Sequence, residues 1–212
     1  MWELLGPAIS QTFVMVIPAT IFSMILGFIL AIALVVTSKD GLKPNRVIYT
    51  ILDFIINILR SFPFLILMVA IIPLTKLIVG TSIGEKAAIV PLTIAAAPFV
   101  ARIIESALKE VDPGVIEAAK AFGASDAQII FKVMLKEAVP AIISGITLTI
   151  ISLIGYSAMA GTIGAGGLGD LAIRYGYQRY ETEIMVVTII ILIIIVQILQ
   201  SLGNYCYKKL SK

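Results

Sequence analysis

Few residues in this chain of 212 have the type and spacing that catalysis needs. The sequence holds no histidine, which excludes a Ser-His-Asp triad and a histidine-ligated metal site. It has no GxxxxGK[ST] phosphate loop, so it cannot hydrolyse ATP by that chemistry. The acids Glu181 and Glu183 stand beside Arg179, and we interpret them as a solvated surface. We expect no catalytic residue, no cofactor and no metal on this chain.

The glycines Gly164, Gly166 and Gly169 match the spacing of a dinucleotide-binding fingerprint. That fingerprint needs a β-strand before it and a helix after it. Here a long apolar stretch precedes the glycines instead. We therefore interpret them as residues that permit close backbone approach and unusual dihedral angles at the end of that stretch.

Composition indicates a membrane protein. Hydrophobic residues make up 59% of the chain and charged residues only 14%, against roughly 25% charged in a soluble domain. Uncharged stretches exceed the roughly 20 residues that cross a bilayer, and two further candidates are interrupted by charges or prolines. We predict an all-α membrane protein, one domain over 1–212, with five spans near 12–36, 50–75, 84–105, 138–160 and 184–206.

The basic residues predict the orientation. They concentrate in the loop 37–49, in the polar insertion that includes 106–137, and at the C-terminus. Placing these segments inside satisfies the positive-inside rule and puts the N-terminus outside and the C-terminus in the cytoplasm. The formal net charge of +3 then reflects loops beside the anionic lipid of the bilayer, and no nucleic-acid partner is expected.

The polar insertion carries local signals for a helical hairpin. Asp112 can cap a helix, and Pro113 suits the first helical position. Gly123 stands where a helix often ends in a left-handed residue. Ser125 and Gln128, three apart, form the pattern of a capping box. The sequence therefore predicts a short helix, a sharp bend and a second helix.

One face of the first short helix is suited to a partner protein. Val115, Ala118, Ala119 and Phe122 share the i, i+3, i+4, i+7 spacing of a single helix face. The two alanines are small enough for a partner to approach the backbone, and Phe122 offers an apolar anchor. The alternative is an ordinary surface hairpin.

This insertion resembles the EAA loop of the permeases of binding-protein-dependent ABC importers. The family pattern reads EAA, three residues, Gly, nine residues, then I-x-L-P. Here the EAA triplet is 117–119 and Gly123 falls in register. Val133 replaces the Ile, Leu135 matches, and Lys136 stands where the pattern has Pro. The resemblance implies the type I importer permease fold with a cytoplasmic coupling loop over 106–137.

Further tracts resemble the methionine-importing branch of these permeases: Arg60–Phe64, Gly80–Leu108 and Gly155–Tyr180. The resemblance implies a second copy of the chain, two cytoplasmic ATPase subunits that hold ATP and Mg, and an extracytoplasmic methionine-binding lipoprotein. It also implies the bacterial plasma membrane. The residues that would contact the ATPase are Glu117, Ala118, Ala119, Phe122 and Gly123.

Candidates for the translocation path lie in the fourth span, which is the central pore helix of that family. Tyr156, Ser157 and Met159 precede the glycine-rich bend. The flexible, polarizable side chain of Met159 could close a narrow path where two subunits meet. Alternatively, Met159 packs in the interface between the subunits.

Arg60 is a charge inside the second predicted span. Such charges are costly and usually face protein or a water-filled cavity. Asp53 lies seven residues earlier, on roughly the same helix face. Arg60 either lines the path, together with Phe62 and Pro63, or extends to the membrane surface from a span that begins near it. Pro63 could also kink the span.

Three functions remain open on the sequence. The first is the permease subunit of a methionine importer, and the second is a permease for another small solute such as a polar amino acid or a phosphonate. The third is an ion-coupled carrier or a structural membrane protein. Carriers often place carboxylates or histidines near the bilayer centre, and this chain has no deep acid apart from Asp53.

Overall fold

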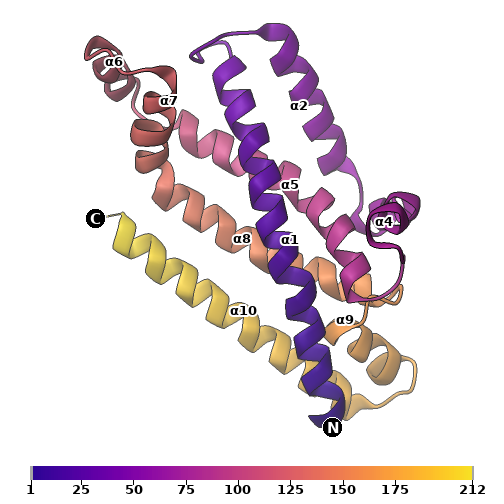
Figure 1. Cartoon of the computed structure of the whole chain (residues 1–212). Coiled ribbons are helices and arrows are strands. Elements are labelled where there is room, and N and C mark those ends of the chain that lie inside the picture. Colours follow the sequence, from indigo (N-terminus) through magenta and orange to yellow (C-terminus); the bar gives the residue numbers. More distant parts are fainter. Residues whose placement is uncertain (1, 212) are drawn as a thin grey trace.

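The computed structural model describes residues 2–211, which form helices joined by short turns (Figure 1). Within that range there is no β-strand, so the predicted all-α fold is confirmed. The elements are α1 (Trp2–Thr37), α2 (Arg46–Ser61), α3 (Phe64–Ala70), α4 (Ile72–Val79), α5 (Glu85–Lys109), α6 (Pro113–Ala121), α7 (Asp126–Gln128), η1 (Ile129–Met134), α8 (Leu135–Gly161), α9 (Gly167–Leu171), η2 (Ala172–Tyr177) and α10 (Thr182–Leu210). The segments η1 and η2 are π-helical turns.

Four helical stretches in the described range are long and apolar enough to cross a bilayer. They are Trp2–Thr37, Glu85–Lys109, Asp126–Gly161 and Thr182–Leu210. A fifth candidate is the pair α2 and α3, which together are long and apolar enough to cross a bilayer but are bent by 105° relative to each other. The five predicted spans therefore correspond to four continuous stretches and one broken pair.

The second predicted span, 50–75, is not one helix. It breaks at Phe62 and Pro63, between the end of α2 and the start of α3. Phe62 is extended, with φ −71° and ψ 127°, which is the conformation that a following proline favours. Pro63 has no N–H to continue the hydrogen-bond ladder of α2. A separate helix, α4, then begins at Ile72.

The first and fourth stretches are longer than predicted. The helix α1 begins at Trp2 rather than near residue 12, although it contains Pro7 and Pro18. The fourth stretch begins at Asp126 rather than near residue 138. Lys136, where the importer pattern has a proline, keeps its backbone N–H, and the helix runs on through Pro140 into the apolar span.

The helices α1, α5 and α8 pack around a common hydrophobic core. All three contribute fully buried side chains, such as Met15, Leu92 and Leu153. Glycines bring the helices together. A Cβ added at Gly27 would lie 2.7 Å from Val100, and one added at Gly145 would lie 2.1 Å from Ile103. These contacts fix α5 between α1 and α8.

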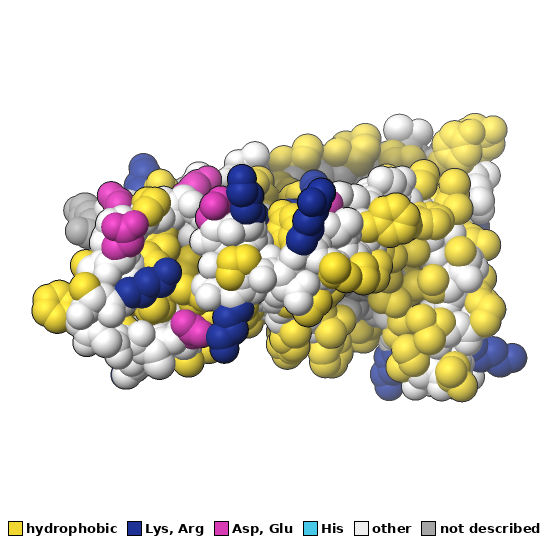
Figure 2. All heavy atoms as spheres, turned by 90° about the horizontal axis from the view of Figure 1, so that it is seen from above, with side chains coloured by type: hydrophobic (Ala, Val, Ile, Leu, Met, Phe, Trp, Pro, Cys, Tyr) yellow, Lys and Arg dark blue, Asp and Glu magenta, His cyan; other side chains and the backbone are white. Residues whose placement is uncertain are grey.

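The ends of the molecule differ in character. In Figure 1, α6 and α7 lie at one end beside the loop that joins α1 to α2, and α9 lies near the N-terminus at the other. Figure 2 looks onto the α6 end and shows acidic and basic side chains gathered there, with hydrophobic side chains over much of the remaining visible surface. Only Ile184 and Thr188 are buried in α10. Such extensive exposed apolar surface fits contact with lipid.

Candidate coupling helix and translocation path

The short helix α6 is fixed at both ends by the groups that the sequence predicted. The Oδ1 atom of Asp112 accepts a hydrogen bond from the Gly114 N–H at 2.7 Å, and Pro113 is the first helical residue. Gly123 has a φ of 77°, the left-handed conformation. Its N–H donates to the Lys120 carbonyl at 2.9 Å and closes the last turn. The predicted start and end of this helix are confirmed.

The second helix of the hairpin also starts as predicted. The Ser125 N–H donates to Gln128 Oε1 at 2.8 Å, and the Gln128 N–H donates to Ser125 Oγ at 3.4 Å. These reciprocal bonds form a capping box. The sequence did not predict that this helix then widens into the π-helical turn η1 before it becomes α8.

The side chains of α6 divide between an inner and an outer face. Ile116 and Ala119 pack against the cluster of buried residues that includes Leu108 and Met134. Val115 and Ala118 are exposed, and the side chain of Phe122 is 92% exposed. The structure therefore places Ala119 toward the bundle and leaves the other three members of the predicted face open.

Charged residues of α6 lie on the side of the helix opposite to Val115, Ala118 and Phe122. Glu117 is exposed and lines a cleft of about 1210 Å³ between α6, the loop after α1 and the end of α5. Lys39, Arg46 and Lys120 also line this cleft. The end of the molecule therefore presents an exposed aromatic side chain at Phe122 and, on the other side of α6, a cleft lined by charged residues.

The three path candidates on α8 point in different directions. Ser157 is 2% exposed, and its Oγ donates to the Ile154 carbonyl at 2.8 Å, so it lies inside this protomer. The Tyr156 ring stacks on the Phe64 ring of α3, with 4.7 Å between centroids and 12° between planes. The side chain of Met159 is 49% exposed. Of the three, only Met159 is largely uncovered by its own protomer.

An uncovered face runs along α8 and includes Met159. Its other exposed members are Ser144, Leu148 and Gly155. The spacings of four, seven and four residues place all four on one side of the helix. The sequence predicted a role for Met159 and not for the other three residues. Apolar and small residues occupy every face of α8, so its sequence has no periodic pattern that marks one face as exposed.

The candidates at the break between α2 and α3 are exposed. Arg60 lies in the last turn of α2, and Phe62 and Pro63 form the break itself. Asp53 does not pair with Arg60: its carboxylate forms an ion pair with Arg102 of α5. The sequence related Asp53 to Arg60 through their shared helix, whereas the tertiary contact joins it to another helix.

The glycine-rich tract makes a tight corner between α8 and α9. Gly166 and Gly167 have φ values of 82° and 84°. The Gly167 N–H donates to Gln11 Oε1 at 2.8 Å, and the Leu168 N–H donates to Thr12 Oγ1 at 3.0 Å. A helix, not a strand, precedes the tract, and side chains of α1 take up the backbone N–H groups that a phosphate would need.

A family model described as "Binding-protein-dependent transport system inner membrane component" matches residues 23–212. The chain belongs to this family. It is 54% identical over 208 residues to a Vibrio cholerae protein named "Probable D-methionine transport system permease protein MetI", covering 98% of the chain and 92% of that protein. It is 48% identical over 171 residues to the Bacillus subtilis "Methionine import system permease protein MetP", covering 81% and 77%.

Solved structures agree with this membership. A chain described as "Inward facing conformations of the MetNI methionine ABC transporter" superposes with a TM-score of 0.97 at 43% identity, covering 100% of this chain and 98% of the other. The fold is therefore that of the type I importer permeases, and this member of the binding-protein-dependent family is a multi-pass inner-membrane protein. An amino acid ABC transporter matches at 21% identity with a TM-score of 0.80 and shows the same fold.

Proposed function

We propose that this chain is the membrane permease subunit of an ATP-driven importer, that it forms the translocation path for methionine, and that α6 receives the separate ATPase subunit. The observation that carries the docking role is the geometry of α6. A short helix closed at both ends holds Phe122 almost fully in solvent at the charged end of the molecule. The names of close relatives support methionine as the substrate.

The mechanical role of α6 follows from its connections. Three residues join α5 to α6, and four join α6 to α7. Ile116 and Ala119 hold the helix against the bundle. Because these connections are short, a displacement of α6 by a partner bound at Phe122 also displaces α5 and α8. In this proposal the partner subunit holds ATP and Mg and hydrolyses the ATP. The permease responds to the movement of that subunit by changing its own conformation, and it breaks no covalent bond.

The path is proposed to lie between two copies of the chain at the uncovered face of α8. Met159 projects from that face near its outer end, where two copies would place two flexible side chains in opposition. Tyr156 links this region to α3 through its stack with Phe64. In this arrangement Ser157 is a packing residue and does not line the path.

The proposed orientation places α6 in the cytoplasm. The basic residues of the loop after α1 lie at the same end as α6, as the ion pair between Lys43 and Asp126 illustrates. The positive-inside rule assigns that end to the cytoplasm. The N-terminus and α9 then face outward, where a methionine-binding lipoprotein delivers the substrate.

Reconstitution tests the proposal directly. The permease, the ATPase and the binding protein from the same organism are placed in proteoliposomes, and uptake of labelled L- and D-methionine is measured with and without ATP. We expect saturable uptake that requires both ATP and the binding protein. If unlabelled polar amino acids or phosphonates abolish the uptake and methionine does not, the substrate assignment is wrong. If uptake follows an ion gradient without ATP, the importer assignment is wrong.

A further inference from the structure

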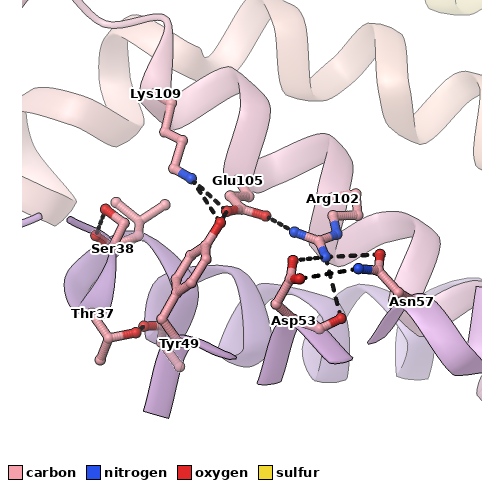
Figure 3. Close-up of polar contacts among 10 residues, drawn as sticks. Thr37, Ser38, Tyr49, Asp53, Asn57, Arg102, Glu105 and Lys109 are labelled. Atoms are coloured by element: carbon pink, nitrogen blue, oxygen red, sulfur yellow. Dashed lines mark hydrogen bonds and ion pairs between the residues drawn. The ribbon is translucent and has the colours of Figure 1, made fainter. Parts of the chain in front are cut away.

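A compact polar cluster joins α2 to the last turns of α5, close to α6. Its centre is Glu105, which is 4% exposed. The Glu105 carboxylate accepts hydrogen bonds from Arg102 Nη1 at 2.7 Å, from Lys109 Nζ at 2.6 Å and from the Tyr49 hydroxyl at 3.2 Å (Figure 3). Tyr49 belongs to α2, so a buried carboxylate of α5 is held from both helices.

Arg102 makes a second bridge between the same helices. Its guanidinium pairs with the Asp53 carboxylate and donates to Asn57 Oδ1 at 3.0 Å (Figure 3). The Asn57 amide donates in turn to Asp53 Oδ2 at 3.1 Å. Two acids and two bases give the cluster no net charge, which is the arrangement that lets ionised side chains persist within membrane-spanning helices.

The remaining attachment of α2 is slight. Ile56 is the one residue of this helix that is buried, and it packs with Leu34 and Ala101. Val47 and Phe54 are among the large apolar side chains that α2 leaves exposed. The polar cluster is therefore a principal connection between α2 and the rest of the protomer.

The cluster connects two segments that lead to functional candidates: α5, which leads to α6, and α2, which leads to α3. On one side, α5 ends at Lys109, and α6 begins at Pro113 after three connecting residues. On the other side, α2 leads through the break at Pro63 to α3, where Phe64 stacks on Tyr156 of α8. The direct route from α6 to α8 runs through the backbone of α7 and η1. The backbone route enters α8 at Leu135, whereas the route through α5, α2 and α3 reaches α8 at Tyr156, near its other end.

We propose that the cluster of Tyr49, Asp53, Asn57, Arg102, Glu105 and Lys109 is a strut that carries the movement of α6 to α2 and α3, with Glu105 as the positioning residue at its centre. This inference rests on the proposed function. While the strut holds, α2 and α5 move as one body, and the Phe64–Tyr156 contact shifts whenever the ATPase moves α6. When the strut is broken, α6 still moves but α3 no longer follows.

The test compares transport with ATP hydrolysis in the reconstituted complex of permease, ATPase and binding protein. In Glu105→Gln, Arg102 and Lys109 lose their shared anion, while the side chain keeps its size. We expect the amount of methionine imported per ATP hydrolysed to fall about fivefold or more, with ATP hydrolysis and assembly retained. Glu183→Gln is the matched control: it makes the same change at an exposed position in the first turn of α10, outside the coupling loop, and should leave the ratio unchanged.

Two further variants separate a strut from a residue that merely stabilises the fold. Asp53→Asn removes one acid from a partly exposed position and should lower the same ratio without loss of the complex. Arg102→Lys keeps the charge but cannot bridge Glu105 and Asp53 with one planar group, so its ratio should be intermediate. A normal ratio in assembled Glu105→Gln and Asp53→Asn complexes would overturn the strut. Absence of ATP-driven uptake by the parent complex would contradict the proposed function instead.

Discussion

At the scale of single residues, two exposed side chains carry the proposed contacts of the subunit, and each makes a separate prediction. Phe122 lies at the end of α6 with almost its whole side chain in solvent. Met159 projects from the uncovered face of α8. Both are apolar side chains in places where a single protomer gives them little to pack against.

Phe122→Ala should weaken binding of the ATPase by about 2 kcal/mol or more, as truncation of a central apolar anchor does. Because Phe122 contributes little to the protomer's own packing, its stability and membrane insertion should be unchanged. The yield of ATPase that co-purifies with the permease measures the effect. Phe22→Ala is the control, since it removes the same side chain from an exposed position on α1. Equal yields from both variants would exclude Phe122 as the anchor.

Met159→Ala separates the two roles considered for this residue. If Met159 closes the path, the variant should leak small solutes from proteoliposomes without ATP. If it packs between two copies, the dimer should lose stability, at most by the roughly 2–5 kcal/mol that a buried Met→Ala change costs in a soluble core. Solute leak and the yield of dimer in detergent are measured together. A tight, stable dimer with normal transport would remove Met159 from the path.

At the scale of elements, the sequence predicted the helix ends correctly but did not predict the contacts between helices. The cap at Asp112, the left-handed Gly123 and the capping box at Ser125 depend on residues within four positions of each other, so the sequence contains all the relevant chemistry. The kink predicted at Pro63 is present, but the proline alone does not predict that the angle between α2 and α3 is 105°. The pair of Asp53 and Arg102 spans 49 positions, and no local pattern predicts it.

Gly123→Val tests whether the end of α6 matters for coupling. A Cβ at this position would meet no other atom within 4 Å, so the cost comes from the φ of 77° alone. A left-handed conformation costs a β-branched residue at least about 1–2 kcal/mol. We expect the last turn of α6 to loosen and uptake per ATP to fall. Gly6→Val is the control. A Cβ added at Gly6 also meets no atom within 4 Å, and the φ of Gly6 is not left-handed, so this variant should transport normally.

At the scale of the whole molecule, the orientation of the protein in the membrane is a prediction that experiment must test, because family membership does not show which end faces the cytoplasm. The charged α6 end should face the cytoplasm and the α9 end the outside. Single cysteines are placed at Thr81, Tyr177 and Lys39, all exposed, in a Cys206→Ser background. An impermeant thiol reagent should label the first two in intact cells, and the third only after permeabilisation. Labelling of Lys39→Cys from outside would reverse the orientation.

The π-helical turn η1 sets the rotational phase of α8 relative to α6. A π-helical turn holds more residues than an α-helical one, and each residue of an α-helix advances the helix by 100°. The six residues Ile129–Met134 therefore decide which side of α8 faces out, more than twenty residues before Met159. Evolution could change the lining of the path by gaining or losing one residue in η1, without changing any residue that touches the solute.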